Sequence, residues 1–219
     1  MVDHVVALDP KPRSHRWSSL SLCILDAVWS IGANYDTVVV KVVREVADSC
    51  GVSHPLIPVS ERLPEDPLPT TKLAELSELE LLAMTNRQRT STRGGITKAD
   101  AALQYAGVFN HFDVTTLRDA VALLNDGPRL DEVDNRLRSL RGDGRHGIRR
   151  GYLWMLIGQN DMIKPDRMVI RWLAKFGVPG GPKVARQYIS AAAPLVAERL
   201  GRAVTPWEID HAIWDCQRK

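Results

Sequence analysis

The sequence predicts an all-α protein of about nine or ten helices, and three observations support this fold class. Apolar residues recur at intervals of three and four along most of the chain, which is the period of a helix with one buried face. Helix-capping side chains precede several of these segments, and glycine follows some of them. Five prolines gather in one stretch, 53–69, which marks a surface connection.

The first half of the chain yields three predicted helices. The segment 18–32 spaces its apolar residues as a buried helix would, and Asp36 can cap a second helix that ends near Gly51. After the proline-rich connection, which should lack regular structure, 70–85 is amphipathic and begins with threonine and glutamate. The residues 86–95 form a basic loop.

The second half continues the helical pattern to the end of the chain. Residues 205–208, Thr-Pro-Trp-Glu, have the form of a capping box with proline at the first helical position, so they should start the last helix. The other predicted helices lie in 96–110, 114–125, 130–140, 145–157, 165–175 and 182–199.

Composition excludes several classes of protein. The chain has 219 residues, of which 44% are hydrophobic and 25% charged, so it can bury a core. No apolar run approaches the roughly 18 residues of a membrane span, and no signal peptide is evident. Three distant cysteines, Cys23, Cys50 and Cys216, form neither a disulfide framework nor a metal cluster. We therefore expect a cytoplasmic protein, and the net charge of +3 permits a nucleic-acid partner.

A glycine turn between two predicted helices is the first candidate site. Gly142, Asp143 and Gly144 separate the helices, and glycine allows positive φ and close approach of a ligand to the backbone. The second helix would offer free N–H groups to a phosphate, with arginines nearby at 141, 145, 149 and 150. A tight turn between packed helices with solvated arginines explains the same residues.

An aspartate downstream is the second candidate. Asp166 follows Pro165 at the start of the predicted helix 165–175. Its simplest role is that of a helix cap.

Together these two segments resemble the helix-hairpin-helix DNA glycosylase superfamily, which includes endonuclease III-like and alkyladenine glycosylase-like enzymes. The family hairpin Leu-x-Gly-x-Gly appears as Leu140-Arg141-Gly142-Asp143-Gly144. The family's aspartate motif appears as 166–171, Asp-Arg-Met-Val-Ile-Arg, about 20 residues later. Weaker similarity at 20–43 and 96–106 extends the resemblance over roughly residues 18–175.

The resemblance implies an architecture of two helical domains flanking a cleft. One domain, residues 31–164, would carry the helix-hairpin-helix motif. The other would combine residues 1–30 with 165–219. Asp166 would then lie at the mouth of the cleft, where sites commonly form.

The resemblance also implies an activity. A monofunctional DNA glycosylase of base excision repair would hydrolyse the N-glycosidic bond of a damaged or modified base flipped out of double-stranded DNA. Asp166 would be the catalytic carboxylate, stabilising the oxocarbenium-like transition state or activating water. The expected DNA contacts are Gly142, Gly144, Arg145, His146 and Arg149. The candidates for the base pocket or the wedge are Trp29, Ile31, Asn34, Tyr35, Tyr152 and Trp154.

Three departures from the family pattern refine this expectation. His146 stands where bifunctional members carry a lysine nucleophile, so lyase activity through a Schiff base should be absent. Asp143 would weaken anion binding unless its side chain turns away or holds a cation. A monovalent cation bound at the hairpin is therefore one of the alternatives. The C-terminal region lacks four cysteines, so we expect no iron–sulfur cluster, no other metal and no cofactor.

Two other functions fit the same sequence. The chain could be a non-catalytic helix-hairpin-helix DNA-binding protein, or an all-α interaction protein with no nucleic-acid role. For the glycosylase and for the non-catalytic DNA-binding protein, the expected partner is double-stranded DNA. We expect a monomer, which would associate with the nucleoid if the protein is bacterial. The sequence does not identify the base, the sequence context or the catalytic competence.

Overall fold

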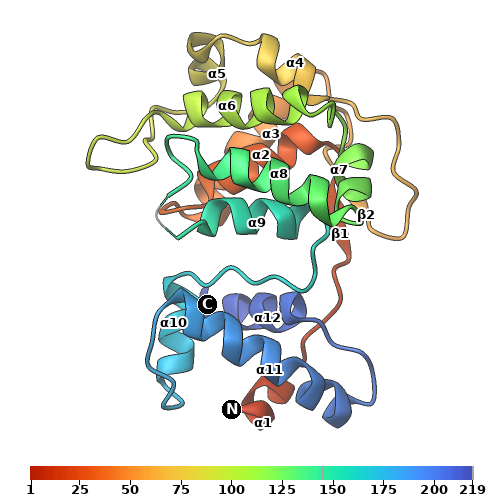
Figure 1. Cartoon of the computed structure of the whole chain (residues 1–219), viewed down its shortest axis with the longest axis vertical. Helices are drawn as coiled ribbons and strands as arrows, with labels where there is room; N and C mark the ends of the chain where they lie inside the picture. Colours follow the sequence, from red (N-terminus) through yellow and green to blue (C-terminus); the bar gives the residue numbers. More distant parts are fainter. Residues whose placement is uncertain (145, 219) are drawn as a thin grey trace. The chain divides into compact units, whose positions relative to one another are not determined.

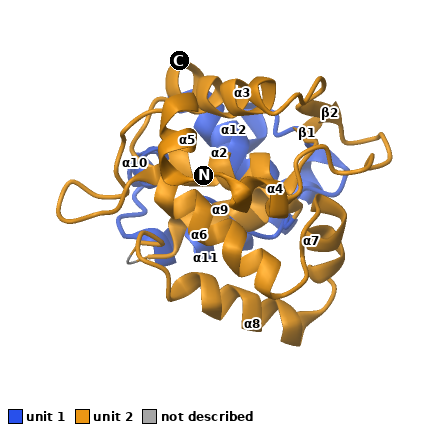
Figure 2. Cartoon of the chain, turned by 90° about the horizontal axis from the view of Figure 1, so that it is seen from above, with its two compact units in different colours: residues 1–13, 159–219 blue, residues 14–158 orange. Residues whose placement is uncertain are grey.

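The computed structural model describes residues 1–144 and 146–218, and Arg145 and Lys219 lie outside the described residues. Within them the protein is all-α, as predicted, with twelve α-helices, a short π-helix and one pair of strands (Figure 1). The chain divides into two compact units, drawn in two colours in Figure 2. We call residues 14–158 the continuous unit, and residues 1–13 with 159–219 the discontinuous unit.

The continuous unit is built around one buried helix, α2 (Leu20–Trp29). Ser19 caps it, its side chain accepting a hydrogen bond from the Ser21 N–H group. All ten residues of α2 are buried, because other helices of the unit surround it and α6 and α9 pack along its length. A helix that is apolar on all sides is expected in such a central position. The remaining elements are β1 (His15–Trp17), η1 (Tyr35–Val39), α3 (Val40–Ser49), β2 (Leu56–Pro58), α4 (Thr70–Glu75), α5 (Glu78–Met84), α6 (Lys98–His111), α7 (Leu117–Leu123), α8 (Gly127–Arg138) and α9 (Ile148–Ile157).

The discontinuous unit joins residues from both ends of the chain. It consists of α1 (Val2–Ala7), α10 (Arg167–Ala174), α11 (Pro182–Leu200) and α12 (Pro206–Arg218). In this unit α1 packs on α11, and α12 packs on both α10 and α11. Ile209 and Ile213 of α12 are fully buried in its core, as expected for packing residues. The predicted capping box is confirmed by reciprocal hydrogen bonds between Thr205 and Glu208.

The boundary between the units differs from the expected one. Residues 14–30 belong to the continuous unit, although they were predicted to form one domain with the C-terminal helices. The reason is that α2 forms the centre of the larger core. At the other boundary the chain changes unit at Gly158 and Gln159, a few residues before the expected position at 164–165.

Four local predictions were wrong. The proline-rich connection contains strand β2, which pairs antiparallel with β1 so that Arg16 faces Ile57. Pro58 is tolerated because it ends a three-residue strand. The predicted helix 70–85 is two helices, since Ser77 forms a capping box with Glu80 and starts α5. Asn34, rather than Asp36, caps the π-helix that opens the second predicted helix. Finally, α1 lies in a region where no helix was predicted.

None of the helices in the described chain combines the length and the apolar character that a membrane crossing requires.

A buried lysine stabilises the end of α2. Lys98, at the start of α6, is 2% exposed. Its Nζ donates to the carbonyl oxygens of Trp29 and Ile31 at 2.8 and 3.0 Å and to Oε1 of Gln88 at 2.9 Å. A cation is favourable at this position, because the carboxyl end of a helix carries partial negative charge and unpaired carbonyl groups.

Replacing this lysine should therefore destabilise the continuous unit. We expect Lys98→Met to lower the free energy of unfolding by about 2–3 kcal/mol, since buried carbonyl groups lose their donor. Urea denaturation followed by tryptophan fluorescence measures the change. Lys41→Met is the control, because Lys41 is exposed and its ion pair with Glu45 is long, at 3.7 Å. Equal stabilities for the two variants would contradict the role assigned to Lys98.

Candidate functional site

The predicted hairpin exists in the continuous unit, between α8 and α9, and three glycines shape it. Gly142, Gly144 and Gly147 have φ values of +103°, +89° and +60°. Residues with a side chain rarely adopt these backbone conformations, so all three positions require glycine. Because Gly147 is the N-cap, α9 begins at Ile148 rather than at the predicted residue 145.

The first two glycines have different surroundings. A Cβ atom on Gly142 would lie 2.9 Å from Cγ2 of Thr90, so this glycine allows the hairpin to pack against the basic loop. A Cβ atom on Gly144 would meet nothing within 4 Å. Gly144 is also exposed, so its backbone is open to a ligand.

The acidic residue of the hairpin points into the protein. Asp143 is 4% exposed. Its Oδ1 accepts a hydrogen bond from the Tyr105 hydroxyl at 2.8 Å, and its Oδ2 accepts one from Nε of Arg150 at 3.4 Å. Burial, and then the charge of Asp143, raise the pKa of Tyr105, so this phenol remains a hydrogen-bond donor. The Asp143 side chain therefore faces the protein interior and not the solvent.

Arg150 links the hairpin to α8 and α9. Its guanidinium also pairs with Asp134, and Asp134 accepts a hydrogen bond from Nε1 of Trp154 at 2.8 Å. Burial opposes the charge of Arg150, but Asp134 and Asp143 outweigh burial and raise its pKa. The hairpin conformation is therefore held by a network of tyrosine, aspartate, arginine and tryptophan side chains.

The predicted DNA-contact residues separate into two groups. Arg149 is buried, its Nε lies 3.5 Å from the carbonyl oxygen of Val28, and burial lowers its pKa. The prediction that Arg149 contacts phosphate was therefore wrong, since this side chain caps α2 from within the core. His146, like Arg141, is exposed. Arg145 is outside the described residues.

The amino end of α9 completes the hairpin. Gly147 has no side chain, and no side-chain hydrogen bond caps this end of the helix within the described chain. The N–H groups of the first turn thus have no side-chain cap among the described residues, and Gly144, three residues before the N-cap, is exposed. Such a helix end attracts anions.

Two of the predicted pocket aromatics belong to the core instead. Trp29 is fully buried, and its Nε1 donates to Oδ1 of Asn86 at 3.1 Å. Trp154 is also buried, with its ring edge-on to Phe109 at 5.8 Å between centroids. The helical spacing of these aromatics reflects packing, so their assignment to a base pocket was wrong.

The turn after α2 holds the two predicted wedge residues. Ile31 is half-buried, and its carbonyl oxygen is fixed by Lys98. Asn34 is exposed, and its side chain accepts a hydrogen bond from the Thr37 N–H group at 2.9 Å. The structure thus explains Asn34 as a helix cap.

Tyr35 and Tyr152 are the two predicted pocket residues that the structure brings together. The Tyr35 hydroxyl donates to Oδ2 of Asp26 at 2.8 Å and shares a hydrogen bond with Tyr152. Nε1 of Trp17 donates to the same oxygen at 2.7 Å. Burial and the Asp26 charge raise the pKa of Tyr35 strongly. Asp26 was not among the predicted site residues, although an aspartate within an otherwise apolar helix was a signal for it.

Asp166, in the discontinuous unit, caps α10. Its Oδ1 accepts hydrogen bonds from the N–H groups of Met168 and Val169 at 2.7 and 3.3 Å. The capping role considered from the sequence is thus confirmed. Asp161, the other carboxylate of this segment, is exposed.

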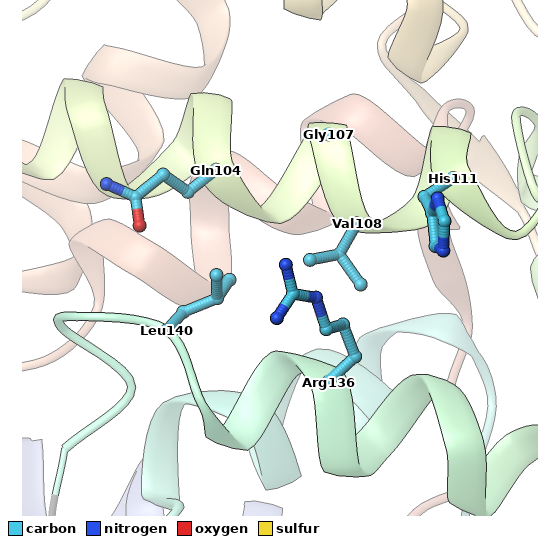
Figure 3. Close-up of a pocket in the computed structure, with 6 residues that line it drawn as sticks. All are labelled: Gln104, Gly107, Val108, His111, Arg136 and Leu140. Carbon is cyan, nitrogen blue, oxygen red and sulfur yellow. The ribbon is translucent and has the colours of Figure 1, made fainter.

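A separate groove of about 260 Å³ lies between α6 and α8. Figure 3 shows Arg136 of α8 beneath Val108 of α6, with Gln104 and His111 on either side. None of the predicted catalytic, DNA-contact or pocket residues lines this groove. No group of three or more potential metal-ligating side chains is found among the described residues.

Comparison with known proteins shows the family of the chain. Residues 2–218 match the model of a family described as a domain of unknown function, DUF8548, and the chain belongs to that family. No curated protein and no solved structure matches it.

The hairpin network makes a testable contribution to stability. Tyr105→Phe removes the hydroxyl that donates to buried Asp143, so we expect the free energy of unfolding to fall by about 1–2 kcal/mol. Tyr188→Phe, on the exposed surface of α11, is the matched control and should leave stability unchanged. Chemical denaturation of both variants measures the difference. A Tyr105→Phe protein as stable as the control would show that the Tyr105–Asp143 bond contributes little.

Proposed function

We propose that this chain is a monofunctional DNA glycosylase of the helix-hairpin-helix kind, which hydrolyses the N-glycosidic bond of a flipped, damaged or modified base. The observation that carries the proposal is the hairpin between α8 and α9. Its glycines adopt positive φ, its backbone is open at Gly144, and its acidic side chain is turned inward.

The hairpin supplies the elements of a phosphate site. The amino end of α9 offers N–H groups and a positive dipole end to an anion. Exposed Arg141 adds positive charge, while Asp143 adds none toward the ligand because Tyr105 and Arg150 bind it. Phosphate contacts of this kind position a protein on DNA without reading sequence.

Asp166 is the proposed catalytic carboxylate. Both of its capping hydrogen bonds go to Oδ1, so capping does not require Oδ2. A carboxylate oxygen beside the sugar stabilises the positive charge that develops as the base leaves, or activates water.

The flipped base would be received near Tyr35 and Tyr152. Both are half-buried and hydrogen-bonded to each other, beside the Asp26 carboxylate. Aromatic faces and a polar group together suit a flipped base, which needs stacking and recognition of its edge. His146 cannot form a Schiff base, so the proposed enzyme would lack lyase activity by that route. We also propose that it works without a cofactor.

A non-catalytic DNA-binding protein is the second candidate. One observation favours it: capping of α10 explains Asp166 without any chemistry. Under this alternative the hairpin binds duplex DNA in the same way, and no base is released.

Base release decides between the two. We expect free base from at least one duplex carrying uracil, mismatched thymine, an alkylated purine, oxidised guanine or hypoxanthine. Asp166→Asn should reduce this release about 100- to 1,000-fold while leaving DNA affinity intact, because the transition state loses a charge that stabilises it. Asp161→Asn, in the same segment, is the control and should retain activity. Full turnover by Asp166→Asn would remove Asp166 from the mechanism.

Salt dependence tests the hairpin as a DNA contact under either candidate. Arg141→Gln should weaken binding and reduce the slope of log affinity against log salt by about one, since one phosphate contact is lost. Arg44→Gln, an exposed position on α3, should leave the slope unchanged. Fluorescence anisotropy with a labelled duplex measures both. Identical slopes for the two variants would argue against docking through the hairpin.

A further inference from the structure

A second carboxylate of the discontinuous unit, Asp210, interacts electrostatically with Asp166. Asp210 lies on α12 and is 5% exposed. Its Oδ1 is buried and has no hydrogen-bond partner within the part of the chain that is described. Ionising a buried carboxyl group whose oxygen has no hydrogen-bond partner is costly in free energy, so burial favours the protonated form of Asp210.

The surroundings of Asp210 connect it to the turn before α10. The Lys164 N–H group donates a hydrogen bond to the Asp210 carboxyl group. The Asp166 N–H group in turn donates to the Lys164 carbonyl oxygen at 2.7 Å, which closes a tight turn around Pro165. One turn therefore connects α12 to the backbone of the proposed catalytic residue.

Two ionisable groups of this segment act on Asp210. The negative charge of Asp166 opposes its ionisation, and the charge of Lys164 favours it. Arg167 and Arg171 of α10 are exposed, and Glu208 of α12 is paired with Arg202. Burial first, and then Asp166, raise the pKa of Asp210 well above its ordinary range.

We propose that Asp210 is a positioning residue for Asp166. As a buried, protonated carboxylic acid, Asp210 keeps the 164–166 turn in contact with α12. This inference rests on the proposed function, because it sets an upper pH above which Asp166 no longer holds its catalytic position. While Asp210 is protonated, Asp166 is the only negative charge of the pair. When alkali removes that proton, two like charges face each other, and repulsion displaces the turn and Asp166 with it.

The first test reads the pair without any substrate. The carboxyl carbons of the ¹³C-labelled full-length protein are followed by NMR against pH. We expect Asp210 to titrate far above the ordinary range of an aspartate, and Asp166→Asn to lower its pKa, because a neighbouring charge is removed. Asp161→Asn should not move it. An Asp210 that titrates in the ordinary acid range, or that ignores Asp166→Asn, overturns the proposal.

The second test uses the pH profile of base release. In the wild type we expect the rate to fall as pH rises through the pKa of Asp210. Asp210→Asn keeps an acceptor for the Lys164 N–H group and has no proton to lose, so this alkaline decline should disappear, and Asp161→Asn should retain it. A decline unchanged in Asp210→Asn contradicts the proposal. If no duplex yields free base, the proposed function fails, while the NMR titration still decides whether the two carboxylates are coupled.

Discussion

The carboxyl end of α2 is the point on which the continuous unit depends. Three carbonyl groups there, of Val28, Trp29 and Ile31, accept hydrogen bonds from the buried cations Lys98 and Arg149. These cations come from the first turns of α6 and α9, the two helices that pack along α2. The position of both helices, and hence of the hairpin, follows from how the central helix ends.

The hairpin adds a second layer to this arrangement. Tyr105 of α6 and Arg150 of α9 both bind Asp143, and Arg150 also pairs with Asp134 of α8. An aspartate that first suggested a poor anion site thus stabilises the glycine turn from behind. Because Tyr105 and Arg150 already compensate its charge, Asp143 would not oppose an anion at the exposed backbone of Gly144 or at the amino end of α9. The same contacts would pre-organise the turn before any ligand arrives, which lowers the entropic cost of binding.

Local patterns predicted much of the fold, and they failed where distant partners decide. Helical periodicity identified most helices, and the caps at Asp166 and Thr205 were readable because capping depends on residues two or three positions away. The fate of Arg149 was not readable, since it depends on Val28, 121 positions earlier. The same holds for strand β2, whose partner lies near the start of the chain, and for Asp26, whose hydrogen bonds come from separate segments. Trp29 and Trp154 were misassigned for the same reason, because spacing alone does not distinguish a core face from a pocket face.

The discontinuous unit has a consequence for the order of events on the ribosome. Helix α1 is translated before its packing partner α11, which begins at Pro182. At a rate of about 10 residues per second, α1 waits more than about 15 s for that partner. The continuous unit emerges completely during this interval. Its core therefore has time to form first. Until α11 emerges, the nascent chain must keep the apolar face of α1, which includes the buried Val5, from engaging the wrong surface.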